Sequence, residues 1–442
     1  QVKFSVILSV YKSNIDFLKA AIESVTDQIY KNWELCISDD CSEDQALSEY
    51  LKNLQASGNQ IKVTFRNETG HISANSNSAL GLASGDWVVF LDHDDLLSED
   101  ALFQVARAIK RHPGVKMVYS DEDKLDSRGV RCSPYFKPKL NRELLRGNNY
   151  ICHLAAYRKD IIDQLGGLRE GYEGAQDHDL ALRVTERCGD GEVVHIPAIL
   201  YHWRVHEGST AGGASVKSYA AESGERAVRD HLDRLSLPAS VARDNRGFYR
   251  VKYKIEGALP SVAIVIPTRD QLTLLKRCIT SIIKNTSYAN YTIYVADNDS
   301  TEPETLLYLR QMQDQKSVSV IKSPGPFNFS RINNHALQEC DEDYFLLLNN
   351  DIVVDSKSWL SDMVALAECQ PDVGVVGSKL LYADGTVQHC GVVVGIGPAA
   401  GHALVGAPGE DLGYGFRGAV NSEFSAVTGA CLLVAKDRYW QV

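Results

Sequence analysis

The fold is indicated most directly by one stretch of the sequence, Trp87-Val88-Val89-Phe90-Leu91-Asp92-His93-Asp94-Asp95. An apolar run of strand-like composition ends in three carboxylates within four positions. This pattern is typical of a buried strand that delivers acids to the edge of a sheet. On strand-like alternation Asp92 and Asp94 point to the same side, which indicates a metal or phosphate site.

The acids could instead belong to the start of the next helix. Ser98, followed by Glu99 and Asp100, could cap and charge a helix that runs from Ala101 to Arg111. The acids at the end of the strand precede that cap and are not needed for it. The stretch taken by itself leaves both interpretations open.

Length and charge bound the class of protein. A chain of 442 residues suggests two or three domains, and its 44% hydrophobic and 23% charged composition is that of a globular protein. The net charge is −11 and no long basic run appears. We therefore expect no nucleic-acid partner, because binding to phosphate backbones requires a basic surface.

The ten cysteines are scattered, without a CxxC pair or a Cys/His cluster at zinc spacing. They predict small buried side chains in a reducing cytosol.

No signal peptide is visible, and no apolar run approaches the roughly 18 residues of a membrane span. The chain begins with Gln1, so we expect a fragment whose targeting or membrane segments lie elsewhere. The expected location is cytoplasmic, with peripheral contact at the inner face of the membrane.

An internal repeat links the two halves of the chain. Several residues recur at a nearly constant offset: 257 for Lys19/Lys276, Ser24/Ser281, Ser73/Ser330 and Asp94/Asp351, and 258 for Asp39/Asp297. Such an offset indicates two copies of one domain, over residues 1–235 and 261–442, with a linker over 236–260.

Each copy alternates strand and helix patterns, which predicts an α/β fold with a mostly parallel sheet. The first copy predicts strands near 4–10, 33–38, 61–66, 86–91 and 115–120, and helices near 15–27, 44–55, 73–83 and 99–111. The second predicts strands near 262–266, 291–296, 318–322 and 343–348. A further helix is expected over 216–235, and the linker has some strand character.

Polar residues follow three strands of the first copy, where ligands bind in open parallel sheets. They are Tyr11, the pair Asp39 and Asp40, and the pair Asp92 and Asp94. Acids at two strand ends favour a nucleotide pocket. Asp39 or Asp40 would accept hydrogen bonds from a base or ribose, Asp92 would face the ribose, and Asp94 would hold a divalent cation.

A divalent cation is expected at this site for reasons of charge. Mg²⁺ or Mn²⁺ is commonly held by one or two carboxylates together with substrate phosphates. No Walker A sequence or GxGxxG motif is present to hold a diphosphate with backbone groups instead. The sequence therefore predicts Mg²⁺ or Mn²⁺ as a cofactor.

The ordered motifs of the chain resemble those of family-2 glycosyltransferases with the GT-A fold. The matching segments are Ser5–Tyr11, which contains Ser9, then Ser38–Ser42, Phe90–Asp95 and Gln176–Leu180. The resemblance implies two tandem GT-A domains, which are Rossmann-like, of the type that builds bacterial O-antigen or capsule. It implies an inverting enzyme that moves a sugar from a nucleotide-diphosphate donor to a glycan or lipid-linked glycan acceptor, with other transferases as expected partners.

The resemblance assigns the catalytic base to Asp177, with Gln176 where an acid is usual. A displacement by a sugar hydroxyl needs a positioned carboxylate to take its proton, and Asp177 enters a predicted helix over 180–188. Asp177 could equally be the N-cap of that helix, and both roles are compatible.

The segment 201–209 resembles one that closes over the diphosphate in some relatives. The resemblance makes His202 and His206 candidate metal ligands, although a lone histidine is more often a structural hydrogen-bonding group. Arg204 is a candidate diphosphate contact because its guanidinium is forked and permanently charged.

Four cations over residues 137–146 form the densest basic patch in the sequence. It could meet a lipid diphosphate or an anionic membrane, but a solvated loop and helix face is the favoured interpretation. The cations are Lys137, Lys139, Arg142 and Arg146.

The second copy keeps part of the proposed site. Pro267 and Asp297 would contact a nucleotide sugar, Asn349 stands where the first copy has Asp92, and Asp351 keeps the metal carboxylate. Lys159 matches Lys436 at an offset of 277, which indicates about 20 extra residues over 378–418 (277 − 257). The base would then fall near position 454 (177 + 277), so we expect a second domain truncated at its C-terminus that binds donor weakly without turning it over.

Two rival functions remain open. A sugar-phosphate nucleotidyltransferase has a similar architecture but would need a glycine-rich loop after the first strand, where Ser9 to Ser13 contain no glycine. A non-catalytic carbohydrate-binding scaffold would explain an incomplete second copy but not the acids of the first.

Overall fold

The computed structural model describes residues 1–206, 218–314 and 318–442. It contains two compact units. Unit 1 comprises residues 1–236, 241–251 and 414–422, and unit 2 comprises residues 237–240, 252–413 and 423–442. None of the described helices combines the length and apolarity that a bilayer crossing requires.

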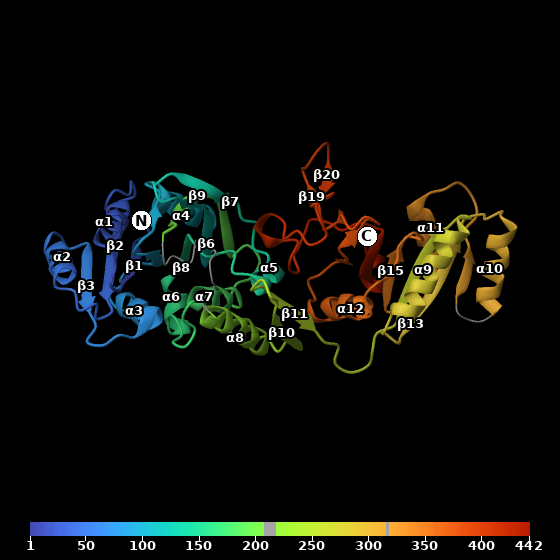
Figure 1. The fold of residues 1–442 in the computed structure, drawn as a ribbon, viewed down its shortest axis with the longest axis horizontal. Helices are drawn as coiled ribbons and strands as arrows, with labels where there is room; N and C mark the ends of the chain where they lie inside the picture. The colour runs from blue at the N-terminus through green and yellow to red at the C-terminus, as the bar shows by residue number, and fades with distance from the viewer. Residues whose placement is uncertain (207–217, 315–317) are drawn as a thin grey trace. The chain divides into compact units, whose positions relative to one another are not determined.

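Unit 1 is built on a mixed sheet with the order β3-β2-β1-β4-β8-β6-β9-β5, with β7 paired to β6 (Figure 1). The first four strands of this order are parallel, and β8 runs antiparallel between β4 and β6. The strands are β1 Phe4–Val10, β2 Trp33–Asp39, β3 Ile61–Phe65, β4 Trp87–Asp92, β5 Leu96–Leu97, β6 Met117–Leu125, β7 Arg131–Tyr135, β8 Ala155–Arg158 and β9 Val193–Arg204.

Helices cover this sheet because the parallel strands are apolar on both faces. Val6 and Leu8 of β1 pack into the core that includes Leu18 and Ile22 of α1, whereas Ile7 packs with Ala79 of α3 on the other face. The helices are α1 Ile15–Thr26, α2 Gln45–Ala56, α3 His71–Leu80, α4 Ala101–Arg111, α5 Arg142–Gly147, α6 Lys159–Leu165, α7 Gln176–Thr185 and α8 Ser218–Arg234.

Strand register brings the polar strand ends of unit 1 together. Val10 at the end of β1 pairs with Asp39 at the end of β2, and Ser9 pairs with Asp92 at the end of β4. Immediately beyond these ends, Lys12 and Cys41 adopt positive φ angles of 46° and 57°. Non-glycine residues in this region are uncommon and concentrate at functional sites.

Unit 2 repeats the arrangement with the strand order β14-β13-β12-β15-β21-β16. The strands are β12 Val262–Thr268, β13 Tyr291–Asp297, β14 Ser319–Lys322, β15 Tyr344–Leu348, β16 Val376–Gly377 and β21 Cys431–Ala435. The helices are α9 Leu272–Asn285, α10 Pro303–Asp314, α11 Phe329–Leu337, α12 Trp359–Cys369 and α13 Lys436–Tyr439. As in unit 1, the first four strands of this order are parallel and the next is antiparallel.

The α/β fold with two mixed sheets is confirmed, and the extra residues of the second copy have structure of their own. They form the ladders β17–β18, over Leu380–Leu381 and Val387–His389, and β19–β20, over Val392–Val394 and Ala400–His402. The β19–β20 hairpin projects from the rest of unit 2 in Figure 1. The stretch expected to link the copies carries the β10–β11 ladder, over Ala239–Arg243 and Tyr249–Tyr253.

The predicted cap of α4 is wrong in detail. The N-cap residue is Asp100, and its side chain makes no capping bond to the helix backbone. Ser98 instead donates its hydroxyl to the Asp100 carboxylate at 2.9 Å. The acids of the preceding turn are therefore not used to start this helix, which leaves them for other contacts.

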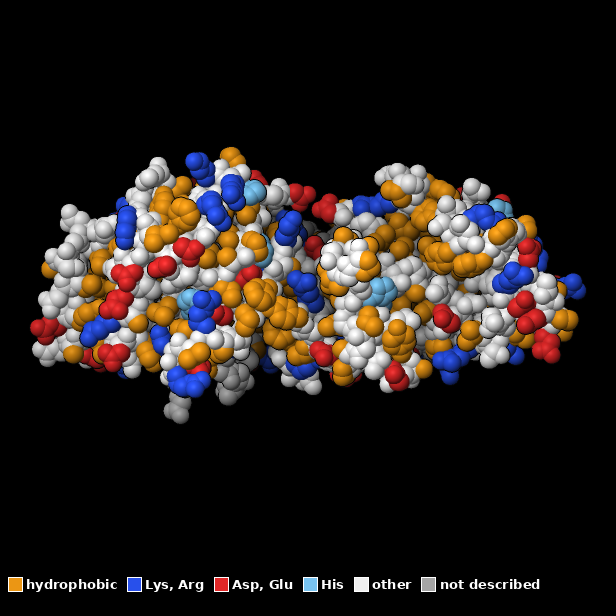
Figure 2. Space-filling model, turned by 90° about the horizontal axis from the view of Figure 1, so that it is seen from above, with side chains coloured by type: hydrophobic (Ala, Val, Ile, Leu, Met, Phe, Trp, Pro, Cys, Tyr) orange, Lys and Arg blue, Asp and Glu red, His pale blue; other side chains and the backbone are white. Residues whose placement is uncertain are grey.

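The cysteines agree with the expectation of buried thiols. The described residues contain no disulfide, and most of the cysteines are buried. On the face drawn in Figure 2, side chains of both charge signs are interspersed with apolar ones.

Candidate active site

Three acids lie where β4 ends and the chain turns into β5. Asp92 is the last residue of β4, and the Asp95 backbone N–H donates to the Asp92 carbonyl at 3.2 Å. Asp95 is fully buried, whereas Asp92 and Asp94 are partly exposed. The turn thus presents carboxylates of different accessibility at one end of the sheet.

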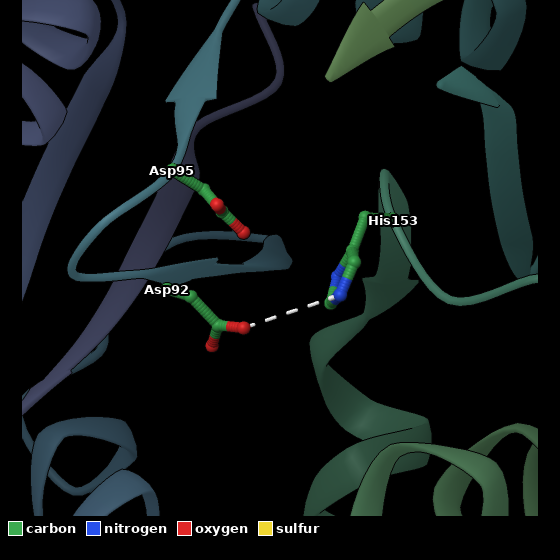
Figure 3. Close-up of side chains that lie close together, drawn as sticks. All are labelled: Asp92, Asp95 and His153. Carbon is green, nitrogen blue, oxygen red and sulfur yellow. Dashed lines mark ion pairs between the residues drawn. The ribbon is translucent and has the colours of Figure 1, made fainter. Parts of the chain in front are cut away.

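Asp92 and Asp95 form a cluster with His153, which lies just before β8 (Figure 3). One ligand atom from each residue lies within 4.8 Å of the others, and His153 Nε2 is 4.0 Å from Asp92 Oδ2. In Figure 3 both carboxylates turn towards the imidazole ring. Two carboxylates and an imidazole are a donor set suited to Mn²⁺, and the carboxylates suit Mg²⁺.

Hydrogen bonds from β9 hold Asp95 in place. The Tyr201 hydroxyl donates to Asp95 Oδ2 at 2.7 Å, and the Arg204 backbone N–H donates to Asp95 Oδ1 at 2.8 Å. Both carboxylate oxygens therefore have a donor in a fully buried position, which satisfies the requirement that buried charge be hydrogen-bonded.

The ring of His153 is positioned by aromatic neighbours from β9. It stacks on Tyr201, with ring centroids 4.6 Å apart and planes at 17°, and it meets Trp203 edge-on at 5.5 Å. Its backbone is held by the buried Lys137, whose Nζ donates to the carbonyls of Ile151 and His153 and to the Glu122 carboxylate.

Burial and mutual repulsion shape the protonation of the acids. Burial raises the pKa of Asp92, His153 opposes this, and the charges of Asp94 and Asp177 raise the pKa further. Burial also raises the pKa of Asp95 well above its usual range, with Asp92 and Asp94 adding to the effect. A cation would relieve this repulsion, so the electrostatics fit the ligand set.

Asp94 and His206 lie together beside the cluster. His206 Nε2 is 2.7 Å from Asp94 Oδ2, so the structure brings together two of the residues expected to bind metal. Arg204 donates from Nε to the Asp94 carbonyl at 2.7 Å and stacks over the Phe17 ring at 4.6 Å. Residues 207–209 of the segment expected to close over the diphosphate lie outside the described residues.

His202, the other expected metal ligand, is engaged elsewhere. Its Nδ1 lies 2.5 Å from Asp123 Oδ1 on β6, and Asp123 also forms an ion pair with Arg131 at 2.6 Å. The structure does not place His202 in the cluster of Asp92, Asp95 and His153.

Asp177 lies in the first turn of α7, which begins at Gln176. The N-cap position is held by Ala175, so the interpretation of Asp177 as the N-cap is wrong. Its carboxylate instead accepts a hydrogen bond from Asn149 Nδ2 at 2.8 Å. Asn149 Oδ1 in turn accepts from the Cys152 backbone N–H at 3.4 Å, so Asp177 is linked to the segment that carries His153.

The acids at the end of β2 hold the neighbouring loops in place. Asp39 accepts hydrogen bonds from the backbone N–H and hydroxyl of Ser42. Asp40 accepts from the Gly70 backbone N–H at 2.9 Å and pairs with Arg66, also at 2.9 Å. Both acids are buried.

The remaining expected nucleotide contacts of unit 1 lie near the end of β1. Ser9 is partly buried on the strand, next to Asp92 in register. Tyr11 follows the strand with 44% of its side chain exposed, and Lys12 Nζ lies 5.2 Å from its ring centroid.

Both interpretations of the basic patch over residues 137–146 are wrong for its main members. Lys137 and Arg146 are buried, and Arg146 pairs with Glu143 at 2.5 Å. Arg142 donates to the carbonyls of Thr185 and Cys188 at 3.0 and 2.9 Å. These three cations satisfy internal acceptors, so they form neither a solvated face nor a surface for anions. Lys139, the fourth member of the patch, is exposed, as the solvated-loop interpretation expected.

In unit 2 the expected site residues occupy matching places with different partners. Asp297 ends β13, is fully buried and forms an ion pair with Lys322. Pro267 lies in β12 beside Ala296, and Asp351 is exposed after β15. The Asn349 backbone N–H donates to the Ala430 carbonyl at 3.0 Å.

Sequence reasoning missed Asp95 and His153 as site residues. Asp95 stands in the decisive stretch, but strand alternation singles out Asp92 and Asp94 only. His153 follows an ordinary apolar segment, and no spacing rule links it to residue 92. Only the antiparallel pairing of β4 with β8 brings it near, with Val89 opposite Ala156.

Comparison with known proteins places these features in a family. A family model described as Glycosyl transferase family 2 matches residues 5–166 and 263–389. The Sinorhizobium fredii protein y4gI is 44% identical over 98% of this chain and 48% of its own length. The O-antigen biosynthesis protein RfbC of Myxococcus xanthus is 35% identical over 98% of this chain and 34% of its own length. The chain thus spans half or less of these relatives.

A solved structure, S. aureus TarS 1-349 in complex with UDP-GlcNAc, is also similar. Its sequence is 23% identical, the match covers 52% of this chain and 66% of that chain, and the TM-score is 0.43.

Proposed function

The chain belongs to glycosyl transferase family 2, and on that premise we propose that unit 1 is an inverting glycosyltransferase. Its donor is a nucleotide-diphosphate sugar, and its acceptor is a glycan or a lipid-linked glycan. The role in bacterial surface-polysaccharide synthesis is supported by the similarity to an O-antigen biosynthesis protein.

One observation carries this proposal. Acids from two strands gather at one edge of the first sheet: Asp39 at the end of β2, with Asp92 and Asp94 at the end of β4. Asp177, in the first turn of α7, is joined through Asn149 to Cys152, which precedes His153. The edge is the one formed by the carboxyl ends of parallel strands, where open α/β sheets bind nucleotides.

The nucleoside would lie against the ends of β1 and β2. A carboxylate offers about four acceptor sites. Asp39 and Asp40 therefore keep acceptor capacity for a base or ribose beyond their bonds to Ser42 and Gly70. The exposed ring of Tyr11, next to Ser9 at the end of β1, offers an apolar face to the base. Asp92 would accept from the ribose or the donor sugar.

The diphosphate would lie against the turn after β4. A divalent cation, Mn²⁺ or Mg²⁺, would be held by Asp92, Asp95 and His153 with Asp94 and His206 beside them, and when bound it neutralises the diphosphate leaving group. We place His206 rather than His202 there because His206 contacts Asp94 and His202 contacts Asp123.

Asp177 would take the proton from the acceptor hydroxyl as that oxygen attacks the anomeric carbon in line with the departing diphosphate. The hydrogen bond from Asn149 orients the Asp177 carboxylate. Arg204, already turned towards the Asp94 carbonyl, would contact the diphosphate.

We assign the transfer to unit 1 rather than to unit 2. The residues of unit 2 that correspond in register to Asp92 and His153 are Asn349 and Ala430. Asp297 and Pro267 keep their places at the strand ends, and Asp351 keeps one carboxylate, so unit 2 retains some groups for a nucleotide sugar. Among the residues that the structure describes, unit 2 shows no matching set of cation ligands.

The test is to incubate the 442-residue chain with a panel of nucleotide sugars, Mn²⁺ and glycan acceptors. We expect release of nucleoside diphosphate that depends on the acceptor and stops on chelation. Release of pyrophosphate would instead identify a sugar-phosphate nucleotidyltransferase. Sugar binding without any release would identify a carbohydrate-binding scaffold.

A further inference from the structure

We propose that Tyr201 is the positioning residue of the cation site, because it contacts Asp92, Asp95 and His153. It acts through these ligands and does not itself touch the substrate. The inference rests on the proposed function of unit 1, since it concerns the same cation site.

The hydroxyl of Tyr201 bridges the two acids. It donates to Asp95 Oδ2 at 2.7 Å and accepts from the Asp92 backbone N–H at 3.3 Å. The accepted bond directs the hydroxyl hydrogen towards Asp95, so the hydroxyl fixes the carboxylate relative to the last residue of β4. This links the first and last acids of the turn through one atom.

The ring of Tyr201 fixes His153, the third residue of the cluster. His153 lies nearly parallel to it, with centroids 4.6 Å apart. Tyr201 itself has no exposed surface. It is held in the interior of the sheet, opposite Glu122 of β6 on one side and Leu97 of β5 on the other. A ring locked in this way prevents the imidazole from rotating away from the carboxylates.

The energetic reason is preorganisation. Metal ligands bind tightly when surrounding groups hold them in place, and removal of such a group typically weakens metal affinity about 10- to 100-fold. Without the hydroxyl, Asp95 would keep only the backbone donor from Arg204 and could turn.

The experiment is a Mn²⁺ titration of the whole chain, without donor, in which electron paramagnetic resonance measures the free and bound Mn²⁺. Tyr201→Phe keeps the ring and removes only the hydroxyl, so we expect the Kd for Mn²⁺ to rise about 10- to 100-fold. The matched control is Tyr119→Phe, because Tyr119 is also buried, donates its hydroxyl to the Pro138 carbonyl and stacks on His195. The control should bind Mn²⁺ as the wild type does. Its shift in melting temperature should be similar to that of Tyr201→Phe.

A double-mutant cycle separates positioning from general packing. In an Asp95→Ala background the hydroxyl has no carboxylate to orient, so Tyr201→Phe should change the Mn²⁺ affinity no further. Unchanged affinity in Tyr201→Phe, additive losses in the cycle, or an equal loss in Tyr119→Phe would each overturn the inference while leaving the proposed function intact. A wild-type chain that binds no Mn²⁺ would overturn the cation site and this inference together.

Discussion

The turns after β4 and β15 occupy the same place in two sheets of the same design, yet they carry different chemistry. Trp87 and Tyr344 begin these strands and pair with equivalent residues of β1 and β12. From that register Asp92 corresponds to Asn349, and Asp95 to Ile352 (offset 257 in each case).

The third ligand is also replaced. Arg158 pairs with Trp87, and Ala435 pairs with Tyr344, which gives an offset of 277 for the following strand. His153 then corresponds to Ala430. The apolar strands that build the sheet are kept in both units, whereas all three members of the cluster differ. The apolar core can therefore be kept while the ligand set changes, because the ligands lie at or beyond the strand ends and the core residues lie within the strands.

The largest expected difference between the units follows from removing the proposed base of unit 1. Asp177→Asn should reduce transfer about 10²- to 10⁴-fold, because an amide cannot take the proton of the acceptor hydroxyl. Donor affinity should change little. Nucleoside-diphosphate release gives the rate, and calorimetry gives the donor affinity.

The control for this substitution is Asp160→Asn. Asp160 is also an acid in the first turn of a helix, and it pairs with Arg158 at 2.6 Å. It should retain full activity. Transfer that survives Asp177→Asn would mean that the reaction belongs to another part of the chain, and a parallel loss of donor binding would make Asp177 structural.

The second prediction concerns cation stoichiometry. We expect one tight Mn²⁺ site per chain, and Asp95→Ile, which installs the residue of unit 2, should weaken it on the order of 100-fold or more. The reciprocal change Asn349→Asp should add no second tight site, since Ile352 and Ala430 supply no ligand. Equilibrium dialysis with Mn²⁺ measures both. Two equal sites in the wild type would contradict the contrast between the turns.

These contrasts also show what the sequence could and could not predict. The repeat and the strands were predictable because β-branched runs and a constant offset are local signals, and they place Asp92 and Asp94 at a strand end. His153 and Tyr201 could not be found in this way. They reach the turn only through the pairing of β4 with β8 and of β5 with β9, across 61 (153 − 92) and 109 (201 − 92) residues.

The basic residues over 137–146 also show a limit of prediction from sequence. A run of cations predicts an exposed surface, because charged side chains are usually exposed. Lys137 is buried instead, because the carbonyls of Ile151 and His153 need a donor and Glu122 needs a counter-charge. Such demands arise from tertiary structure, so no sequence window contains them.

A third prediction tests a buried charge that only unit 1 has. Glu34 on β2 accepts from Ser5 at 2.6 Å and pairs with Lys3 and Lys62 at 2.6 and 3.0 Å. In unit 2 the corresponding strand pair is Ala263 and Thr292. Glu34→Gln should destabilise unit 1 by about 1.5–3 kcal/mol, the range for hydrogen bonds to charged groups. Hydrogen exchange of peptides from β1, β2 and β3 reports this locally.

The pH dependence of the same group has a definite sign. Burial alone would raise the pKa of Glu34, but hydrogen bonds from Lys3, Ser5 and the Ser84 backbone outweigh it and hold the pKa well below its usual range. Its stabilising contribution is present above the unfolded value, about 4.3, and is lost as pH falls below that value. Between pH 5 and pH 3, on the order of this window, unit 1 of the wild type should lose more stability than unit 1 of Glu34→Gln.

The control for this prediction lies in unit 2. Thr292→Val at the corresponding position should change the stability of unit 2 by less than about 1 kcal/mol, without the same acid dependence. If unit 1 lost equal stability between pH 5 and pH 3 in the wild type and in Glu34→Gln, the Glu34 network would not be the source of the acid dependence.

The smallest expected effect lies at the ends of β2 and β13. Asp39 stands opposite Phe65 in register, whereas Asp297 stands opposite Lys322 and pairs with it. Lys322→Phe would install the arrangement of unit 1. Because the Lys322 side chain is 65% exposed and Asp297 keeps the Ser300 backbone donor at 3.0 Å, we expect unit 2 to lose less than about 1 kcal/mol. Exchange of peptides from β13 and β14 measures it. A loss above about 2 kcal/mol would mean that the buried Asp297 depends on its lysine, and that the two strand ends differ in how they tolerate charge as well as in which ligands they carry.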